Sequence, residues 1–201
     1  MGMRKYLYIF VFVFFVLLIG AGCGLKQAEI KSPVSGKEDA PLKIVEWFDF
    51  QCPACKNYED SVMHFVIEDY VKTGKANITY KNLAFIGVES RRAANAALCA
   101  HEKGKFDEYY QKLYKNQAGE NEGFLTDSRL IAFGNELGID IKECAEQDKY
   151  RGQISKELQE AKSLRVNGTP TLFVNGNKIK LPSSYLSMKQ FLDEELSKIK
   201  K

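Results

Sequence analysis

Cys52 and Cys55 are the residues of this chain that are best placed to do chemistry. Pro53 and Ala54 separate them, and the four residues stand between an apolar run at residues 44–50 and a helical pattern. Two thiols at this spacing can form a reversible disulfide. A helix N-terminus favours the nucleophilic thiolate and lowers a thiol pKa of about 8.5 to roughly 3.5–7.5. The position predicts a redox pair, with Cys52 as nucleophile and Cys55 as buried resolving thiol.

A Cys-x-x-Cys pair can also belong to a zinc site, which needs two further ligands, usually a second close pair of cysteines or histidines. Cys99 and Cys144 are far apart in the sequence, and the two histidines of the chain are His64 and His101. A copper site would need a histidine or methionines beside the cysteines, and Met63 and His64 lie too far along the helix. We therefore expect redox chemistry with no metal and no organic cofactor.

A strand and a helix must hold these residues, and the hydrophobic pattern predicts both. Residues 42–50 are expected to form a largely buried strand. A helix should run from Pro53 to Gly74, because apolar residues, among them Val62, Phe65 and Tyr70, recur at spacings of three and four and make one face. Pro53 suits the first helical turn, where its missing N–H costs nothing. A second strand is predicted at residues 77–85.

The rest of the pattern predicts an α/β fold of the thioredoxin-like type. A helical block is expected at about residues 87–150, followed by a charged helix at 150–164. A strand at 171–174, a turn at Asn175-Gly176, a returning strand at 177–181 and a helix at 185–199 then complete the chain. This order is the thioredoxin architecture with an inserted α-helical subdomain.

Residues 1–25 have the composition of a targeting segment. Arg4 and Lys5 precede a nearly unbroken apolar run at residues 6–22, close to the ~20 residues that span a membrane. The segment is either a signal peptide or a transmembrane anchor. It also resembles a lipoprotein cleavage box ending at Cys23, which would then be lipidated, although Gly20 stands where such boxes usually have Leu. Each interpretation places the domain outside the cytoplasm.

The bulk composition limits the remaining possibilities. Residues 26–40 are polar and aperiodic and are predicted to be a linker, with residues 41–201 as one domain. The chain is 45% hydrophobic and 27% charged, which predicts a folded core. The net charge is +3 and the basic residues are scattered, which argues against a nucleic-acid-binding protein.

Three segments resemble the DsbA-like thiol-disulfide oxidoreductases, extracytoplasmic enzymes with a helical insert in a thioredoxin fold. They are residues 45–55, 94–106 and 166–176, and the resemblance spans about residues 40–200. It implies that Thr169-Pro170 forms a cis-proline loop that faces the disulfide and offers its backbone to an extended substrate peptide. An ordinary turn before a strand is the alternative for this loop.

The resemblance assigns roles to residues around the cysteine pair. It implies that Glu46 is a buried acid beneath Cys55 that exchanges protons with it, for which a raised pKa is suited. The alternative is an exposed strand glutamate. Pro53 and Ala54 would contact the substrate and tune the thiolate. Many oxidases of the family have a histidine where Ala54 stands, so we expect a less stabilised Cys52 thiolate and a less oxidising enzyme than the family's extremes.

Cys99 and Cys144 both fall in the predicted helical insert. The resemblance implies a second, structural disulfide between them, because an oxidising compartment pairs neighbouring thiols. Two unrelated buried cysteines are the alternative.

Together these features predict an extracytoplasmic thiol-disulfide oxidoreductase that donates disulfides to reduced secreted or membrane proteins. Family analogy adds a membrane-bound reoxidase as partner, and a monomer is expected. Two alternatives stay open. A disulfide reductase or isomerase fed from the membrane would use the same residues, because direction depends on potential and partner. A non-catalytic peptide-binding module would tolerate Cys52→Ser.

Overall fold

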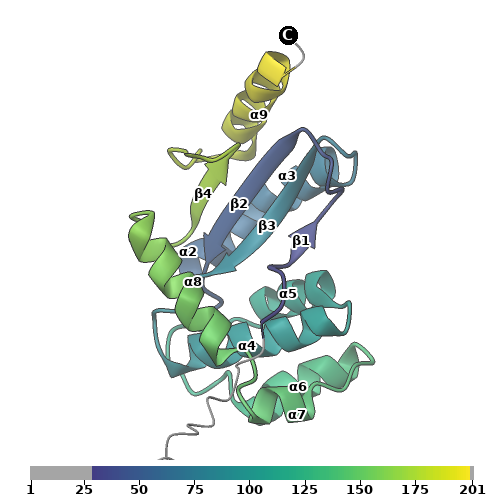
Figure 1. Cartoon of the computed structure of the whole chain (residues 1–201), viewed down its shortest axis with the longest axis vertical. Helices are drawn as coiled ribbons and strands as arrows, with labels where there is room; N and C mark the ends of the chain where they lie inside the picture. Colours follow the sequence, from purple (N-terminus) through teal and green to yellow (C-terminus); the bar gives the residue numbers. More distant parts are fainter. Residues whose placement is uncertain (1–28, 200–201) are drawn as a thin grey trace, which may run out of the picture.

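The computed structural model describes residues 29–199. In this part of the chain, five strands form one mixed sheet with the order β1-β3-β2-β4-β5 (Figure 1). β2 and β3 are parallel, and the other neighbouring pairs are antiparallel. The strands are β1 (Val34–Ser35), β2 (Leu42–Phe48), β3 (Ala76–Asn82), β4 (Thr171–Val174) and β5 (Asn177–Lys178).

The helices form three groups along the chain. A continuous helical segment follows β2 and consists of α2 (Pro53–Tyr58), η1 (Glu59–Met63), α3 (His64–Val66) and η2 (Ile67–Val71), of which η1 and η2 are π-helical. The insert consists of α4 (Val88–Glu102), α5 (Phe106–Lys115), α6 (Asp127–Glu136) and α7 (Lys142–Glu146). The third group is α8 (Arg151–Ser163) before β4 and α9 (Tyr185–Ile199) after the hairpin.

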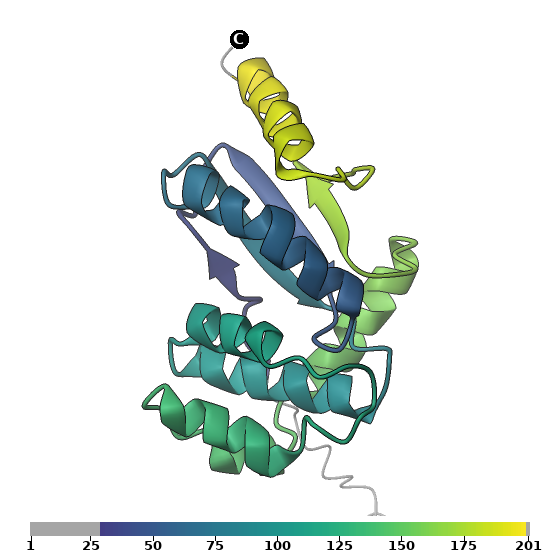
Figure 2. The ribbon, with the colours of Figure 1, turned by 180° about the vertical axis from the view of Figure 1, so that it is seen from behind.

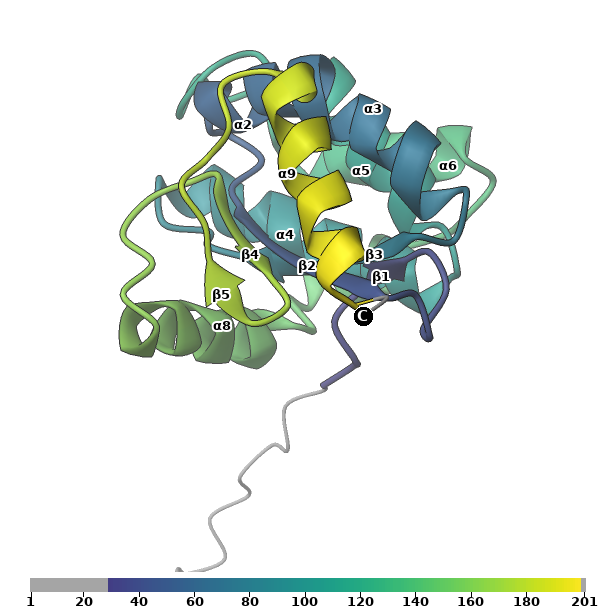
Figure 3. The same cartoon turned by 90° about the horizontal axis from the view of Figure 1, so that it is seen from above.

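The sheet separates two hydrophobic layers. Figure 3 shows α8 on one side of the sheet and the α2–η2 segment on the other, and Figure 2 shows that segment lying across the sheet from behind. The insert closes one end of the molecule, and α9 lies at the opposite end (Figure 1). The main core fills the space between the sheet, the α2–η2 segment and the insert. A smaller cluster under α8 is centred on Trp47 and Ala161.

Residue alternation along β2 explains how one strand serves both layers. Side chains two residues apart point to the same face of a strand. Leu42, Ile44 and Phe48 therefore enter the main core, whereas Trp47 enters the smaller cluster. Glu46 shares the face of the three apolar residues and is 1% exposed. An acid is thus placed in an apolar interior by a strand pattern that is otherwise hydrophobic.

The predicted thioredoxin-like α/β fold is confirmed. The helices from residues 88 to 146 correspond to the predicted block, and β4 and α9 have their predicted bounds. The first two strands end earlier than predicted, at Phe48 and Asn82, because the chain turns after each: the Cys52 N–H bonds the Asp49 carbonyl at 3.0 Å and the Phe85 N–H bonds the Leu83 carbonyl at 2.9 Å. The returning strand is limited to Asn177–Lys178.

The prediction that residues 26–40 form a linker is wrong for its second half, which contains a strand. Val34–Ser35 form β1 and pair with Thr79 and Ile78 of β3. Ser35 is buried, and its hydroxyl bonds the Asp107 carboxylate of the insert. A short polar strand has little hydrophobic periodicity, so the sequence does not predict β1. It forms because it pairs with β3. The predictions for residues 1–25, including Cys23, lie outside the described residues. Every helix within residues 29–199 is too short or too polar to span a bilayer.

Candidate active site

The cysteine pair lies where β2 ends and α2 begins. Cys52 is the N-cap residue of α2, and Pro53 occupies the first helical turn. Both cysteines are free thiols in the structure. Cys52 is 8% exposed and Cys55 is 1% exposed, because Cys52 stands at the helix end and Cys55 one turn further in. Access from solvent therefore favours Cys52.

The pKa values of the two thiols are shifted in opposite directions. A hydrogen bond from Cys55 lowers the pKa of Cys52 to about 6, with help from Thr169 and from the backbone N–H groups of Cys55 and Ala54, while partial burial opposes the shift. Burial raises the pKa of Cys55, and the neighbouring Cys52 raises it further. Near neutral pH the pair therefore holds one thiolate, on Cys52, and one thiol, on Cys55.

The loop before β4 lies against the nucleophile. The Thr169-Pro170 peptide bond is cis, and the Cys52 thiol donates a hydrogen bond to the Thr169 carbonyl at 3.4 Å. The Thr169 hydroxyl is buried and has no hydrogen-bond partner among the described residues. Pro53 and Ala54 are exposed beside the thiol. The structure thus brings together the cysteine pair, its intervening residues and the proline loop.

Glu46 is buried on β2, on the face of the sheet that carries the main core. Burial raises its pKa, Glu59 of η1 raises it further, and the neighbouring Tyr110 hydroxyl opposes the shift. One oxygen of its carboxyl has no partner among residues 29–199. Glu46 is therefore the buried acid of the sequence prediction and not an exposed strand residue. Its role in proton transfer stays a prediction.

Glu59 is a second buried acid that the sequence analysis missed. It is 2% exposed, and its carboxylate accepts hydrogen bonds from Gln111 at 2.7 Å and from Tyr110 at 3.2 Å. Burial raises its pKa. Glu59 follows Cys55 by four residues, which places it on the same helix face. That spacing is the sequence signal that could have identified it.

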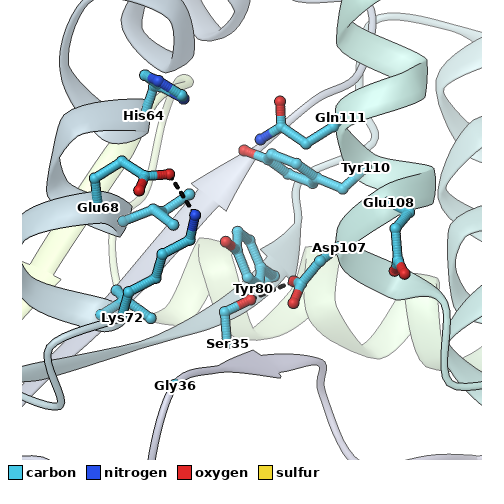
Figure 4. A pocket seen from close by; sticks show the side chains of 12 residues that line it. Ser35, Gly36, His64, Glu68, Lys72, Tyr80, Asp107, Glu108, Tyr110 and Gln111 are labelled. Atoms are coloured by element: carbon cyan, nitrogen blue, oxygen red, sulfur yellow. Dashed lines mark hydrogen bonds and ion pairs between the residues drawn. The ribbon is translucent and has the colours of Figure 1, made fainter.

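A cleft of about 560 Å³ lies beside this acid pair. Figure 4 shows His64, Glu68 and Lys72 on one side of it and residues of α5, including Tyr110 and Gln111, on the other. Tyr110 and Gln111, which line the cleft, also donate hydrogen bonds to the Glu59 carboxylate.

Cys99 and Cys144 form a disulfide that joins α4 to α7, with Cα atoms 5.9 Å apart. The bridge lies within the insert and is distinct from the Cys52–Cys55 pair. His101 bonds the Lys31 carbonyl at 3.0 Å, so it holds the N-terminal residues of the domain.

Comparisons with a family model, with related sequences and with solved structures agree on one family. A family model described as Thioredoxin matches residues 28–194. A probable disulfide bond formation protein D of Bacillus cereus is 34% identical over 170 residues, covering 81% of this chain and 78% of the relative. Oxidised BdbD from Bacillus subtilis has a TM-score of 0.77 at 27% identity, covering 85% of this chain and 96% of that one. Chlamydia trachomatis DsbA has a TM-score of 0.72 at 20% identity, with 83% and 92% covered, and shows the fold alone.

Proposed function

Because the chain belongs to the DsbA-like thiol-disulfide oxidoreductases of the thioredoxin family, we propose that it donates disulfides to reduced proteins through Cys52 and Cys55. The observation that carries the direction is the opposite tuning of the two thiols, with the Cys52 pKa at about 6 and the Cys55 pKa raised. A stabilised Cys52 thiolate favours the reduced enzyme, and a stable reduced form makes the oxidised form a stronger oxidant.

The proposed reaction is two successive thiol-disulfide exchanges. A substrate thiolate attacks the sulfur of Cys52 in the oxidised pair. The Cys52–Cys55 bond breaks, a mixed disulfide forms, and the Cys55 sulfur leaves with the electron pair and takes up a proton. A second substrate thiolate then attacks the substrate sulfur of the mixed disulfide and releases the Cys52 thiolate. Two electrons pass from the substrate to the enzyme pair.

In this proposal Glu46 exchanges the proton that Cys55 needs. A buried Cys55 thiolate is costly, so a proton must reach the sulfur as the disulfide opens. Glu46 is suited to this because burial and Glu59 raise its pKa, which keeps the carboxyl protonated at a higher pH than an exposed glutamate. Tyr110 and Gln111 bond Glu59 and line the cleft, and in this proposal the proton exchanges with solvent on that side.

We further propose that the substrate peptide lies along Thr169-Pro170, with Pro53 and Ala54 as neighbouring contacts. The Thr169 carbonyl reaches the Cys52 thiol, so a peptide bound to this loop would hold its cysteine at the nucleophile. Reduced secreted or membrane proteins are the substrates, and a membrane-bound reoxidase restores the disulfide. Residues 1–25 would serve as the signal or anchor that places a monomeric domain outside the cytoplasm.

The test is the reduction potential of the Cys52–Cys55 pair in the purified full chain, equilibrated in glutathione buffers. A potential well above that of the glutathione couple supports a disulfide donor. A low, thioredoxin-like potential would overturn the direction and identify a reductase instead. Cys52→Ser must abolish oxidation of a reduced, unfolded protein substrate, whereas a non-catalytic peptide-binding module would retain its function in this variant.

A further inference from the structure

The backbone that carries the nucleophile is held by a buried polar network. Asp49 is 1% exposed, and its carboxylate accepts from the N–H of Gln51 at 2.9 Å and the hydroxyl of Ser90 at 2.6 Å. The same carboxylate accepts from the N–H groups of Phe85 and Ile86. The turn between β2 and α2 is therefore tied to the start of the insert.

The insert also reaches this turn through a loop in its middle. We call residues 116–126, between α5 and α6, the insert loop. The Asn121 N–H donates to the Gln51 side chain at 2.6 Å, and the Asn121 side chain donates to the Ile86 carbonyl at 3.3 Å. The loop passes so close to Gly87 that a Cβ built there would lie 2.0 Å from the Asn121 side-chain oxygen. The loop thus packs directly on the residues beside the active site.

Gln117 makes the contact nearest to the nucleophile. Its side-chain amide donates to the Phe50 carbonyl at 2.7 Å and to the Cys52 carbonyl at 3.1 Å. The Cys52 carbonyl also accepts from the Lys56 N–H at 3.2 Å, in the first hydrogen bond of α2. One glutamine therefore fixes both the last turn before Cys52 and the first turn after it.

This contact can act on the sulfur through the helix. The backbone N–H groups that lower the Cys52 pKa are those of Cys55 and Ala54, and they belong to the turn that the Cys52 carbonyl closes. Hydrogen bonds from backbone N–H groups stabilise an anion only when the groups point at it. Ala54 has no polar side chain that could replace them.

We infer that Gln117 is a positioning residue for Cys52: it holds the first turn of α2 so that the amides of Ala54 and Cys55 stabilise the thiolate. The insert thereby sets the reactivity of the thioredoxin-like half. The inference rests on the proposed role of Cys52 as nucleophile. It assigns to the insert loop a part in tuning the redox pair, in addition to its structural part.

The test is the pKa of Cys52 in the full chain, measured from the pH dependence of alkylation of the reduced protein. Gln117→Met keeps the length of the side chain and removes the donor. We expect it to raise the Cys52 pKa by about 0.5–1 pH unit, the effect of one lost hydrogen bond. Gln117→Glu should raise it at least as much, because an ionised carboxylate facing two carbonyls repels them and adds negative charge near the thiolate.

Asn116→Ala is the matched control, because the Asn116 side chain bonds the Lys112 carbonyl of its own helix. It should leave the Cys52 pKa at the wild-type value. A lower melting temperature with an unchanged Cys52 pKa in either Gln117 variant would overturn the inference and assign Gln117 a structural role alone. That result is distinguishable from failure of the proposed function, because the wild-type reduction potential, and not the pKa difference, reports the direction of transfer.

Discussion

At the scale of single residues, the site holds one negative charge on the sulfur of Cys52 and none on the sulfur of Cys55. Cys52 and Cys55 are the same residue type three positions apart, yet the Cys52 pKa falls to about 6 and burial raises the Cys55 pKa. A hydrogen bond from Cys55 and the backbone N–H groups of Cys55 and Ala54 act on the first sulfur. The second sulfur lies in the core, where a charge finds little solvation.

This asymmetry predicts selective alkylation. Iodoacetamide should modify Cys52 of the reduced protein and spare Cys55, because the thiolate is the reactive form. The rate should be half-maximal near pH 6, at the Cys52 pKa, and should fall about tenfold for each pH unit below it. Mass mapping of the labelled peptide checks the site. Comparable labelling of Cys55 near neutral pH would contradict the prediction.

Glu46 provides a prediction for stability. Its pKa is raised in the folded state, so the folded protein holds this proton more tightly than the unfolded chain, whose glutamates titrate near 4.3. Its contribution to stability is complete below about pH 4.3 and is lost as the pH rises through the raised pKa. Glu46→Gln should therefore unfold less readily than wild type at neutral pH, by about 1–2 kcal/mol in urea titrations.

The same variant should slow disulfide exchange by about tenfold or more, because a glutamine cannot transfer the proton. Glu157→Gln is the control. Glu157 is also buried, with a pKa raised by burial, but it bonds Asn82 at the opposite side of the sheet. It should change stability and leave the exchange rate intact. Equal rates in Glu46→Gln and wild type would remove Glu46 from the mechanism.

The residues that we propose to perform chemistry could be identified from the sequence better than those that support them. The cysteine pair, Glu46 and the Thr169-Pro170 loop occupy recognisable positions relative to predicted elements. Glu59 offers only its spacing of four residues from Cys55, and Gln117 offers no local signal, because its role depends on contacts between distant parts of the chain. Gln117 is separated from Cys52 by 65 positions, and no local pattern marks such a contact.

At the scale of elements, the helix after the cysteine pair departs from its predicted pattern. The sequence predicts a regular helix with Phe65 on the apolar face, but Phe65 is 44% exposed. The cause is η1, a π-helical turn in which hydrogen bonds span five residues and shift the faces of the residues that follow. Hydrophobic periodicity identifies this helix, but it assumes the same number of residues in every turn. It therefore assigns Phe65 to the wrong face.

The disulfide between α4 and α7 gives a prediction for the insert. It closes a loop with a sequence separation of 45 residues, and removing such a cross-link frees the unfolded chain. Cys99→Ala with Cys144→Ala should lower the free energy of unfolding by about 4 kcal/mol. Urea unfolding of the double variant measures the loss. The Cys52 pKa should be retained, and its loss would show that the bridge supports the active site directly.

At the scale of the whole molecule, the site lies where three separate parts of the chain meet. The end of β2 and the start of α2 supply the thiols, the loop before β4 supplies the Thr169 carbonyl, and the insert supplies Tyr110, Gln111 and Gln117. The groups that lower the Cys52 pKa are Cys55 and Ala54 of the first turn of α2 and Thr169 of a distant loop, so the thiolate is stabilised only when the fold brings them together. Redox state and global stability must then be coupled.

The reduced protein should accordingly be more stable when Cys52 is ionised. The Cys52 pKa is about 6 in the fold and about 8.5 in an unfolded chain. A lowered pKa contributes stability that is complete above the unfolded value and is lost as the pH falls through the folded value. The contribution is about 1 kcal/mol at pH 7, about 3 kcal/mol above pH 8.5 and negligible below pH 5.

Melting temperatures of the reduced protein and of its Cys52→Ala variant test this coupling, because the variant cannot form the thiolate. The difference between the two should grow from pH 5 to pH 8.5. The oxidised protein has no Cys52 thiolate, so its stability should lack this pH-dependent component. A constant difference between reduced wild type and variant across the whole range would mean that the fold does not stabilise the thiolate, and the basis for disulfide donation would be lost.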